Sequence, residues 1–373
     1  MSERERSVRA FGACGDGVTD DFVAFMRAIG DGGQTVRIPT GVYLIGQTLL
    51  IPDDTTLLAD TGARILFDGE RHKSAGEFLL SNADPEHGNR HITICGGIWD
   101  GNNQGKGNRK PPITQLSGYS GVVLNFFNVR ELTLDGIEVA DSVTYNIRLS
   151  RVDGFVLNNI SFSSVVPGWN QDGIHCAGEV RNGIVRHIRA ITPGQTNDDL
   201  IALNADDCLT RVENVGTVCG VIENLLIEDV YAENCHTLLR LLSVDSPIRH
   251  VTVRNLQGGF RCFAINADGA RYCATPLFSD GERPMGIGRI ENVSICGISC
   301  YPVGSMNPAV CLETQARNFT ISDFSCPVGA CPALQARHLP GALLHVDQLC
   351  QRLNATDVLT LAKFENLILT SGE

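Results

Sequence analysis

Arg130-Glu131-Leu132-Thr133-Leu134-Asp135-Gly136-Ile137 is one copy of a phrase that recurs through the chain. In each copy a polar pair precedes an apolar–polar–apolar triplet, two polar or small residues and a further apolar residue. The other copies begin at Arg90, Asp153, Asn182, Glu223, Arg249, Glu291, Arg317 and, in part, Glu365. Their first apolar positions are 40, 23, 29, 41, 26, 42, 26 and 48 residues apart. This spacing indicates a period of about 25 residues with insertions.

The alternation inside the phrase has a period of two, which is typical of a strand with one buried face. A single strand cannot bury that face, but stacking each copy on the next one does. The fixed leucine pattern of leucine-rich repeats is absent, and helical repeats need longer amphipathic helices. We therefore predict an all-β fold, a single-stranded right-handed parallel β-helix (solenoid).

Composition narrows the function classes. The chain has 373 residues, of which 43% are hydrophobic, and a net charge of −12. The apolar content excludes wholesale disorder, and the acidic balance argues against a nucleic-acid partner. The chain has no apolar run of about 18 residues, so we predict no membrane partner. The first residues lack a signal peptide, so we expect a cytoplasmic protein, or a secreted one whose signal was removed.

The 14 cysteines are spread along the chain, often within apolar runs. They are best interpreted as small buried hydrophobic residues. Two pairs, Cys296 with Cys300 and Cys326 with Cys331, leave open a zinc site, although their spacing is loose. We expect no metal and no cofactor.

A short helix is predicted near the N-terminus, because Phe22, Met26 and Ile29 share one helical face. Thr19 or Asp20 is expected to be its N-cap. Residues 35–45 then predict two short strands around a turn. We expect a single domain, 1–373, with an N-terminal cap and first strands in 1–50, regular coils in 90–330, and a last coil and C-terminal cap in 331–373. The helix would cover the open end of the β-helix.

The N-terminal segment carries a resemblance. Gly15-Asp16-Gly17-Val18-Thr19-Asp20-Asp21, the short helix and Ile38-Pro39-Thr40-Gly41-Val42-Tyr43 resemble the cap of the pectin-lyase-like β-helix superfamily. That superfamily includes the polygalacturonases of glycoside hydrolase family 28, phage tailspikes and other carbohydrate-active proteins. The acids of this segment are interpreted as turn and cap residues rather than a cation site.

Candidate catalytic acids precede two strands of the middle coils. Aligning Ile174 with Ile201 places Asp172 beside Asp199 on adjacent coils, which are about 4.8 Å apart. Asp198 adds a third acid. The same alignment predicts an outward column of basic residues that flanks the acids, made of Arg148, His175 and Arg240.

Clustered carboxylates suit glycoside hydrolysis, because one must be protonated while another activates water. Close like charges raise one pKa and supply the proton donor. Arg148, His175 and Arg240 are predicted to bind substrate, as are Trp169, by stacking on a sugar ring, and Asn170. These assignments compete with a structural role, since β-helices also stack Asn and Asp in turns. Asp206 and Asp207 are interpreted as such turn residues.

Part of this site is similar to family 28. Asn170-Gln171-Asp172 and Asp198-Asp199 resemble the family's Asn-x-Asp and Asp-Asp motifs. The resemblance implies that Asp199 is the general acid, and that Asp172 and Asp198 activate water with inversion. No histidine between Cys208 and Gly220 matches the family's Gly-His-Gly. Leu242 stands where the family's Arg-x-Lys has a lysine that binds a galacturonate carboxylate, which allows a neutral sugar.

We therefore expect a glycoside hydrolase that acts on a polysaccharide or oligosaccharide. A polysaccharide lyase or epimerase on the same scaffold, often dependent on calcium, is the alternative. A non-catalytic glycan-binding or tailspike-like protein is a second alternative. The sequence leaves the sugar, the linkage and the oligomeric state open.

Overall fold

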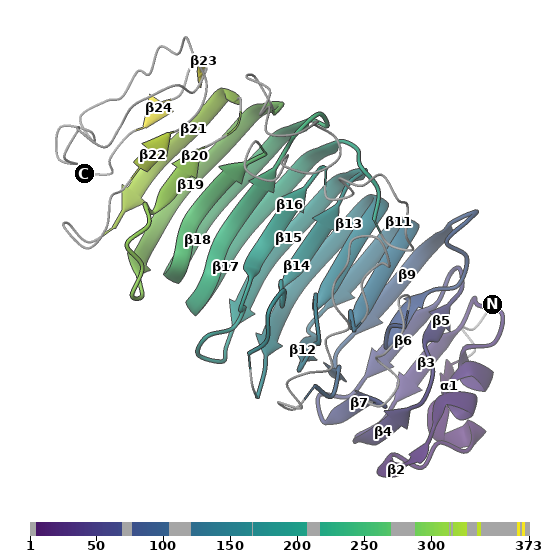
Figure 1. Cartoon of the computed structure of the whole chain (residues 1–373). Coiled ribbons are helices and arrows are strands. Elements are labelled where there is room, and N and C mark those ends of the chain that lie inside the picture. The colour runs from purple at the N-terminus through teal and green to yellow at the C-terminus, as the bar shows by residue number, and fades with distance from the viewer. Residues whose placement is uncertain are drawn as a thin grey trace, which may run out of the picture.

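The computed structural model describes residues 5–68, 77–103, 121–165, 167–206, 217–269, 288–312, 314 and 316–326. It also describes the backbone of 334–336, 364–365 and 368–369. The chain winds into a parallel β-helix whose coils stack side by side, from the purple N-terminal end to the green and yellow end in Figure 1. The predicted all-β solenoid is confirmed.

The first half of the described chain contains β1 Glu5–Ser7, η1 Val8–Phe11, β2 Asp16–Asp20, α1 Phe22–Ile29, β3 Thr35–Ile38, β4 Gly41–Ile45, β5 Leu49–Ile51, β6 Thr56–Ala59, β7 Ala63–Phe67, β8 Leu80–Asn82, β9 Asn89–Cys95, β10 Ile98–Asp100, β11 Leu124–Asp135, β12 Glu138–Ala140 and β13 Ile147–Ser163. The second half contains β14 Ile174–Ala177, β15 Val180–Ala190, β16 Asp199–Asn204, β17 Ile222–Leu242, β18 Ile248–Asp268, β19 Ile290–Pro302, β20 Val310–Leu312, β21 Ala316–Ser325, β22 Leu334–Ala336, β23 Phe364–Glu365 and β24 Ile368–Leu369.

Each copy of the repeated phrase pairs in parallel with the copies before and after it. The first apolar positions form one inward stack through the coils, and their side chains are buried. Along the described strands this stack consists of Ile92, Leu132, Phe155, Gly183, Leu225, Val251, Val293 and Phe319. Equivalent positions of the repeat therefore predict which residues pair between neighbouring coils.

One copy is shifted by a residue from its predicted alignment. Phe155 pairs with Gly183, not with Ile184. A Cβ on Gly183 would lie 2.0 Å from the Cζ of Phe155, so the ring fills the space that a side chain would take. The inward position therefore carries a glycine, which the apolar pattern alone assigned to the turn.

The polar pair that opens each phrase has two structural tasks. Its second residue adopts a left-handed backbone with φ between 51° and 77°; these residues are His91, Glu131, Gly154, Asn182, Asn224, His250, Asn292 and Asn318. Glycine and asparagine tolerate this conformation better than other residues. Asparagines at this turn also stack: Asn224 Nδ2 donates to Asn182 Oδ1 at 3.0 Å, and Asn318 Nδ2 donates to Asn292 Oδ1 at 2.8 Å.

The first residue of the pair forms a ladder of alternating charge, here called the charge ladder. Its aligned members are Asp153, Arg181, Glu223, Arg249, Glu291 and Arg317. Glu223 lies 3.3 Å from the Nε of Arg181 and 2.7 Å from the Nε of Arg249. Each coil of this ladder therefore presents a charge opposite to that of the next one, whereas Arg90 and Arg130, at the same position of the first two copies, form a pair of like charge.

The N-terminal end of the stack is covered by α1, as predicted (Figure 1). Phe25 and Ile29 are fully buried in the core, and Phe25 packs edge-on against Tyr43 with ring centroids 5.3 Å apart. The N-cap position belongs to Asp21, and not to Thr19 or Asp20 as predicted. Its carboxylate accepts the backbone N–H groups of residues 14 and 15 at 2.6 and 2.9 Å. The acidic segment is therefore part of the cap.

Four described cysteines, Cys176, Cys235, Cys300 and Cys311, are buried. Cys296 Sγ contacts Asp323 Oδ2 at 3.0 Å, while Cys331 lies outside the described residues. Most of the segment 331–373, predicted as a last coil and cap, also lies outside them. Its described strands β22, β23 and β24 continue the parallel stack. None of the described helices is long and apolar enough to cross a membrane.

Candidate active site

The predicted alignment of the middle coils is confirmed. Ile174 of β14 pairs with Ile201 of β16, so Asp172 and Asp199 precede matching strand positions on adjacent coils. The polar column also forms in the expected register, from Arg148 through His175 and Ala202 to Arg240. Aligning the strands in the sequence therefore placed these residues correctly relative to one another.

The three aspartates are less exposed than we expected for a cluster on the outer face of the β-helix. Asp172 and Asp199 are only 3% and 2% exposed, whereas the side chain of Asp198 retains 27% exposure. Neighbouring polar side chains cover the carboxyl groups, as the following contacts show. The site is a shielded set of acids with one accessible carboxyl.

Burial changes the protonation of all three acids. Burial and the adjacent Asp198 carboxylate together raise the pKa of Asp199 to about 7, against the opposing effect of Arg240. Burial and the charge of Asp172 raise the pKa of Asp198 to about 7. Burial raises the pKa of Asp172 to about 6, against the opposing effect of His175. At neutral pH the cluster can therefore hold a proton beside an ionised carboxylate.

His175 is buried against Asp172 and does not face solvent. Its Nδ1 lies 2.5 Å from Asp172 Oδ2, and its ring stacks on Tyr145 with centroids 3.8 Å apart. Asp172 Oδ1 is buried and has no hydrogen-bond partner among the described residues. The stacked imidazole thus fixes one carboxyl oxygen of Asp172, while the other lies buried beside it.

Arg240 joins Asp199 to a fourth acid that the sequence analysis missed. Its Nη1 lies 3.4 Å from Asp199 Oδ2, and its Nε lies 3.4 Å from Asp268 Oδ1. Asp268 is fully buried, two residues beyond Asn266, which pairs with Arg240 in the column. The sequence signal that could have identified Asp268 is an acid two positions beyond the column residue, on the coil that follows Arg240.

His236 is the second residue that the sequence analysis missed. Its Nδ1 lies 3.4 Å from Asp198 Oδ1. Burial and the positive charges of Arg261 and Arg240 lower the pKa of His236 to about 4, so the imidazole is neutral at pH 7. The segment from Cys208 to Gly220 has no histidine, whereas the coil that follows Asp199 carries His236 before Arg240 in the same strand, β17.

Arg148 was predicted to lie in an outward column, but its side chain is buried. It occupies the predicted column position but is completely buried. Its Nε donates to Asn125 Oδ1 at 2.8 Å, and its guanidinium lies 5.3 Å from the centroid of the Phe78 ring. The Phe78 ring lies beside the guanidinium, so substrate binding by Arg148 stays a prediction.

Trp169 and Asn170 lie in the loop that leads into β14. Trp169 is 74% exposed, and Asn170 has a left-handed φ of 56°. The loop is tied to the neighbouring acid loop, because Asn197 Nδ2 donates to Gly168 O at 2.9 Å. Both residues therefore border the acid loop, and their binding of substrate stays a prediction.

Arg261 holds the acid loop from the other side. Its Nη2 donates to Asn197 Oδ1 at 2.6 Å, and its Nη1 donates to Asn234 O at 2.5 Å. The backbone N–H of His236 also donates to Thr196 O at 2.9 Å. The loop that carries Asp198 is thus fastened to the next two coils.

Asp206 has the structural role that was predicted. Its Oδ2 accepts the backbone N–H groups of Val244, Asp245 and Ser246 at 2.6 to 2.8 Å. It therefore fixes the turn after β17. Asp207 lies outside the described residues.

Asp198, Asp199 and His236 form the group of described residues that could hold a metal ion, with ligand atoms within 4.8 Å of one another. Calcium takes about six to eight oxygen ligands. This group offers an imidazole and two carboxyl groups, one of them shared with Arg240. The donor set does not fit a calcium site.

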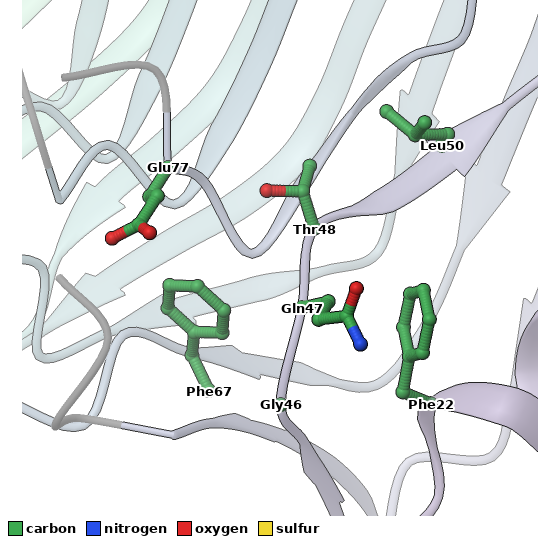
Figure 2. Close-up of a pocket in the computed structure, with 7 residues that line it drawn as sticks. All are labelled: Phe22, Gly46, Gln47, Thr48, Leu50, Phe67 and Glu77. Carbon is green, nitrogen blue, oxygen red and sulfur yellow. The ribbon is translucent and has the colours of Figure 1, made fainter. Parts of the chain in front are cut away.

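A separate cavity of about 370 Å³ lies near the N-terminal cap (Figure 2). Phe22, Leu50 and Phe67 supply apolar walls, and Glu77 is the acid among the residues that line it. Figure 2 shows these side chains around the segment from Gly46 to Thr48. The cavity lies at the coils of β5 and β8 and does not bring the predicted catalytic residues together.

The comparisons with known proteins agree with this fold. Residues 5–94 match the family model described as Rhamnogalacturonase A/epimerase, pectate lyase-like. The preneck appendage protein of Bacillus phage PZA is 29% identical over 140 residues, which cover 36% of this chain. The match spans only 16% of that appendage protein. An exopolygalacturonase of Arabidopsis thaliana is 23% identical over 228 residues, 57% of this chain and 49% of that protein.

Solved structures share the fold across most of the chain. The family 28 exopolygalacturonase of Yersinia enterocolitica has a TM-score of 0.59 and 16% identity, covering 100% of this chain and 79% of that one. PfbA, a surface adhesin of Streptococcus pneumoniae, has a TM-score of 0.58 and 15% identity, covering 89% and 82%. The A-module of the Azotobacter vinelandii mannuronan C-5 epimerase AlgE4 has a TM-score of 0.52 and 14% identity, covering 98% and 96%. The N-terminal segment thus resembles the pectate lyase-like family, and the chain shares the parallel β-helix fold of these structures, among them a family 28 exopolygalacturonase.

Proposed function

We propose that the chain is an inverting glycoside hydrolase whose substrate is a polysaccharide or oligosaccharide. The observation that carries the proposal is the set of three aspartates on neighbouring coils, Asp172, Asp198 and Asp199, whose burial raises each pKa to about 6 or 7. Such a set supplies an acid and a base at the same pH.

In this mechanism Asp199 donates its proton to the glycosidic oxygen as the bond to the anomeric carbon breaks. Water attacks the anomeric carbon from the opposite face and gives a proton to Asp172, whose lower pKa keeps it ionised. Asp198 helps to hold the water. The imidazoles support the acids: His175 orients Asp172, and neutral His236 lies beside Asp198, as a counterpart of the histidine that the family 28 resemblance lacked.

A lyase or epimerase is less well supported. Those reactions need a base that removes a proton next to a substrate carboxylate. Arg240 is the base that the sequence offered, and it is paired with both Asp199 and Asp268. The calcium that often assists such reactions also does not fit the donor set.

The test is product analysis on a panel of uronate-rich and neutral glycans. We expect the wild type to release new reducing ends, and Asp199→Asn and Asp172→Asn to lower kcat by at least about 100-fold, the usual worth of general acid–base catalysis. Asp153→Asn, on the charge ladder, is the matched control and should keep full activity. Full activity in Asp199→Asn would falsify the assignment, and an unsaturated product would identify a lyase.

A further inference from the structure

Arg240 is the cation of the column that lies nearest the candidate acids, and its charge is engaged on two sides. Nη1 faces Asp199, and Nε and Nη2 face the two oxygens of Asp268 at 3.4 and 3.5 Å. The Arg240 side chain is 15% exposed and the Asp268 side chain is fully buried. Asp268 therefore takes the fork of donors that a substrate carboxylate would otherwise accept.

The charged groups around Arg240 also disfavour the binding of a substrate carboxylate. Among the described side chains, four carboxyl groups (Asp172, Asp198, Asp199 and Asp268) gather around Arg240. Arg261 is the other guanidinium of the site, and it is committed to the acid loop through Asn197 and Asn234. Leu242 occupies the position two residues after Arg240 and brings no charge. Those of these carboxyl groups that are ionised would repel a carboxylated sugar in a site of low dielectric constant.

We infer that Asp268 is a specificity-determining residue, which pairs with Arg240 and thereby selects neutral sugars over uronates. This inference rests on the proposed glycan-binding role of the site and names its substrate class. Asp268 acts through Arg240 and does not touch the substrate itself.

The test compares two forms of one ligand, α-1,4-linked trigalacturonate and its fully methyl-esterified form, which differ in charge and share the sugar backbone. Binding is measured by titration calorimetry at pH 6.5. We expect the wild type to prefer the neutral ester. Asp268→Asn should shift the affinity ratio at least tenfold toward the charged form, because a neutral amide no longer competes by charge for the Arg240 guanidinium.

Two controls separate charge from damage to the fold. Asp268→Glu keeps the charge and should keep the preference of the wild type. Glu223→Gln removes one charge from the distant charge ladder and should leave the ratio unchanged. A second readout is the pH–rate profile: loss of the Asp268 charge lowers the pKa of Asp199, so the alkaline limb of Asp268→Asn moves to lower pH.

The inference is overturned if Asp268→Asn gains no affinity for the charged form, whether or not the wild type binds either ligand. It is also overturned if the wild type prefers the charged form. Failure of the proposed function has another signature, which is the absence of hydrolysis across the glycan panel. Because the specificity is measured by binding, the two failures are distinguishable.

Discussion

At the scale of single residues, the fit between Phe155 and Gly183 shows how closely neighbouring coils are matched. The ring of Phe155 lies where a Cβ on Gly183 would be, and both residues are buried. Protein interiors are packed as densely as organic crystals, so this space cannot absorb another carbon without movement. The glycine is there because of a side chain on another coil.

Gly183→Ala is therefore expected to lower the free energy of unfolding by about 1–3 kcal/mol, the usual cost of overpacking a core. Urea denaturation measures the change. Phe155→Leu in the same chain should recover part of the loss, because the smaller side chain makes room. Gly168→Ala is the control, since its added Cβ would meet Gln171 at an ordinary 3.5 Å. Equal losses in the two single variants would contradict this packing argument.

At the scale of elements, the charge ladder determines how one strand lies on the next. Glu223 is the centre of its best-defined part, with Arg181 on one side and Arg249 on the other. Directly opposed pairs of opposite charge stabilise neighbouring strands by about 0.2–1 kcal/mol each, and like charges destabilise them. The ladder thus adds to the register that the inward apolar stack already defines.

Glu223→Lys should replace two attractions with two repulsions and lower the free energy of unfolding by about 1–2 kcal/mol. Glu223→Gln should lose about half as much. Thermal melts at low and high salt measure both effects, and the deficit of Glu223→Lys should shrink at about 1 M salt, where the Debye length is about 3 Å. A deficit independent of salt would assign the effect to packing rather than charge.

The elements also show what the sequence could predict. The strands follow from alternation, and Ile174 opposite Ile201 follows from aligning the two strands that the acids precede, so Asp172, Asp199 and Arg240 could be placed together. The burial of Arg148 could not be predicted, because Phe78 arrives from a distant part of the chain. His236 and Asp268 were missed because their roles depend on which coils flank Asp199.

At the scale of the whole molecule, the site in the middle coils carries a stability penalty that depends on pH. The folded pKa of Asp199 is about 7, above its ordinary value of 3.8. The folded state therefore binds a proton that the unfolded state releases, and stability falls as pH rises from about 4 to about 7. Asp172 and Asp198 act in the same direction, whereas His236, with its lowered pKa, acts in the opposite direction.

We expect the wild type to gain stability between pH 7.5 and pH 5, and Asp199→Asn to gain less over the same interval. Each unit by which a carboxyl pKa is raised corresponds to about 1.4 kcal/mol above that pKa. Chemical denaturation at several pH values, on both proteins, measures the two slopes. If Asp199→Asn shows the same pH dependence as the wild type, the proton is held elsewhere.

The charge ladder also limits how such a molecule can change in length over evolution. If the coil of Glu223 alone were lost, Arg181 would lie against Arg249, two like charges at one step of the stack. If the coils of Glu223 and Arg249 were lost together, Arg181 would meet Glu291 and the alternation would be restored. In this stretch the gain or loss of two coils keeps opposite charges in contact, whereas the gain or loss of one coil brings like charges together. The alternating charges therefore favour insertions and deletions of an even number of coils.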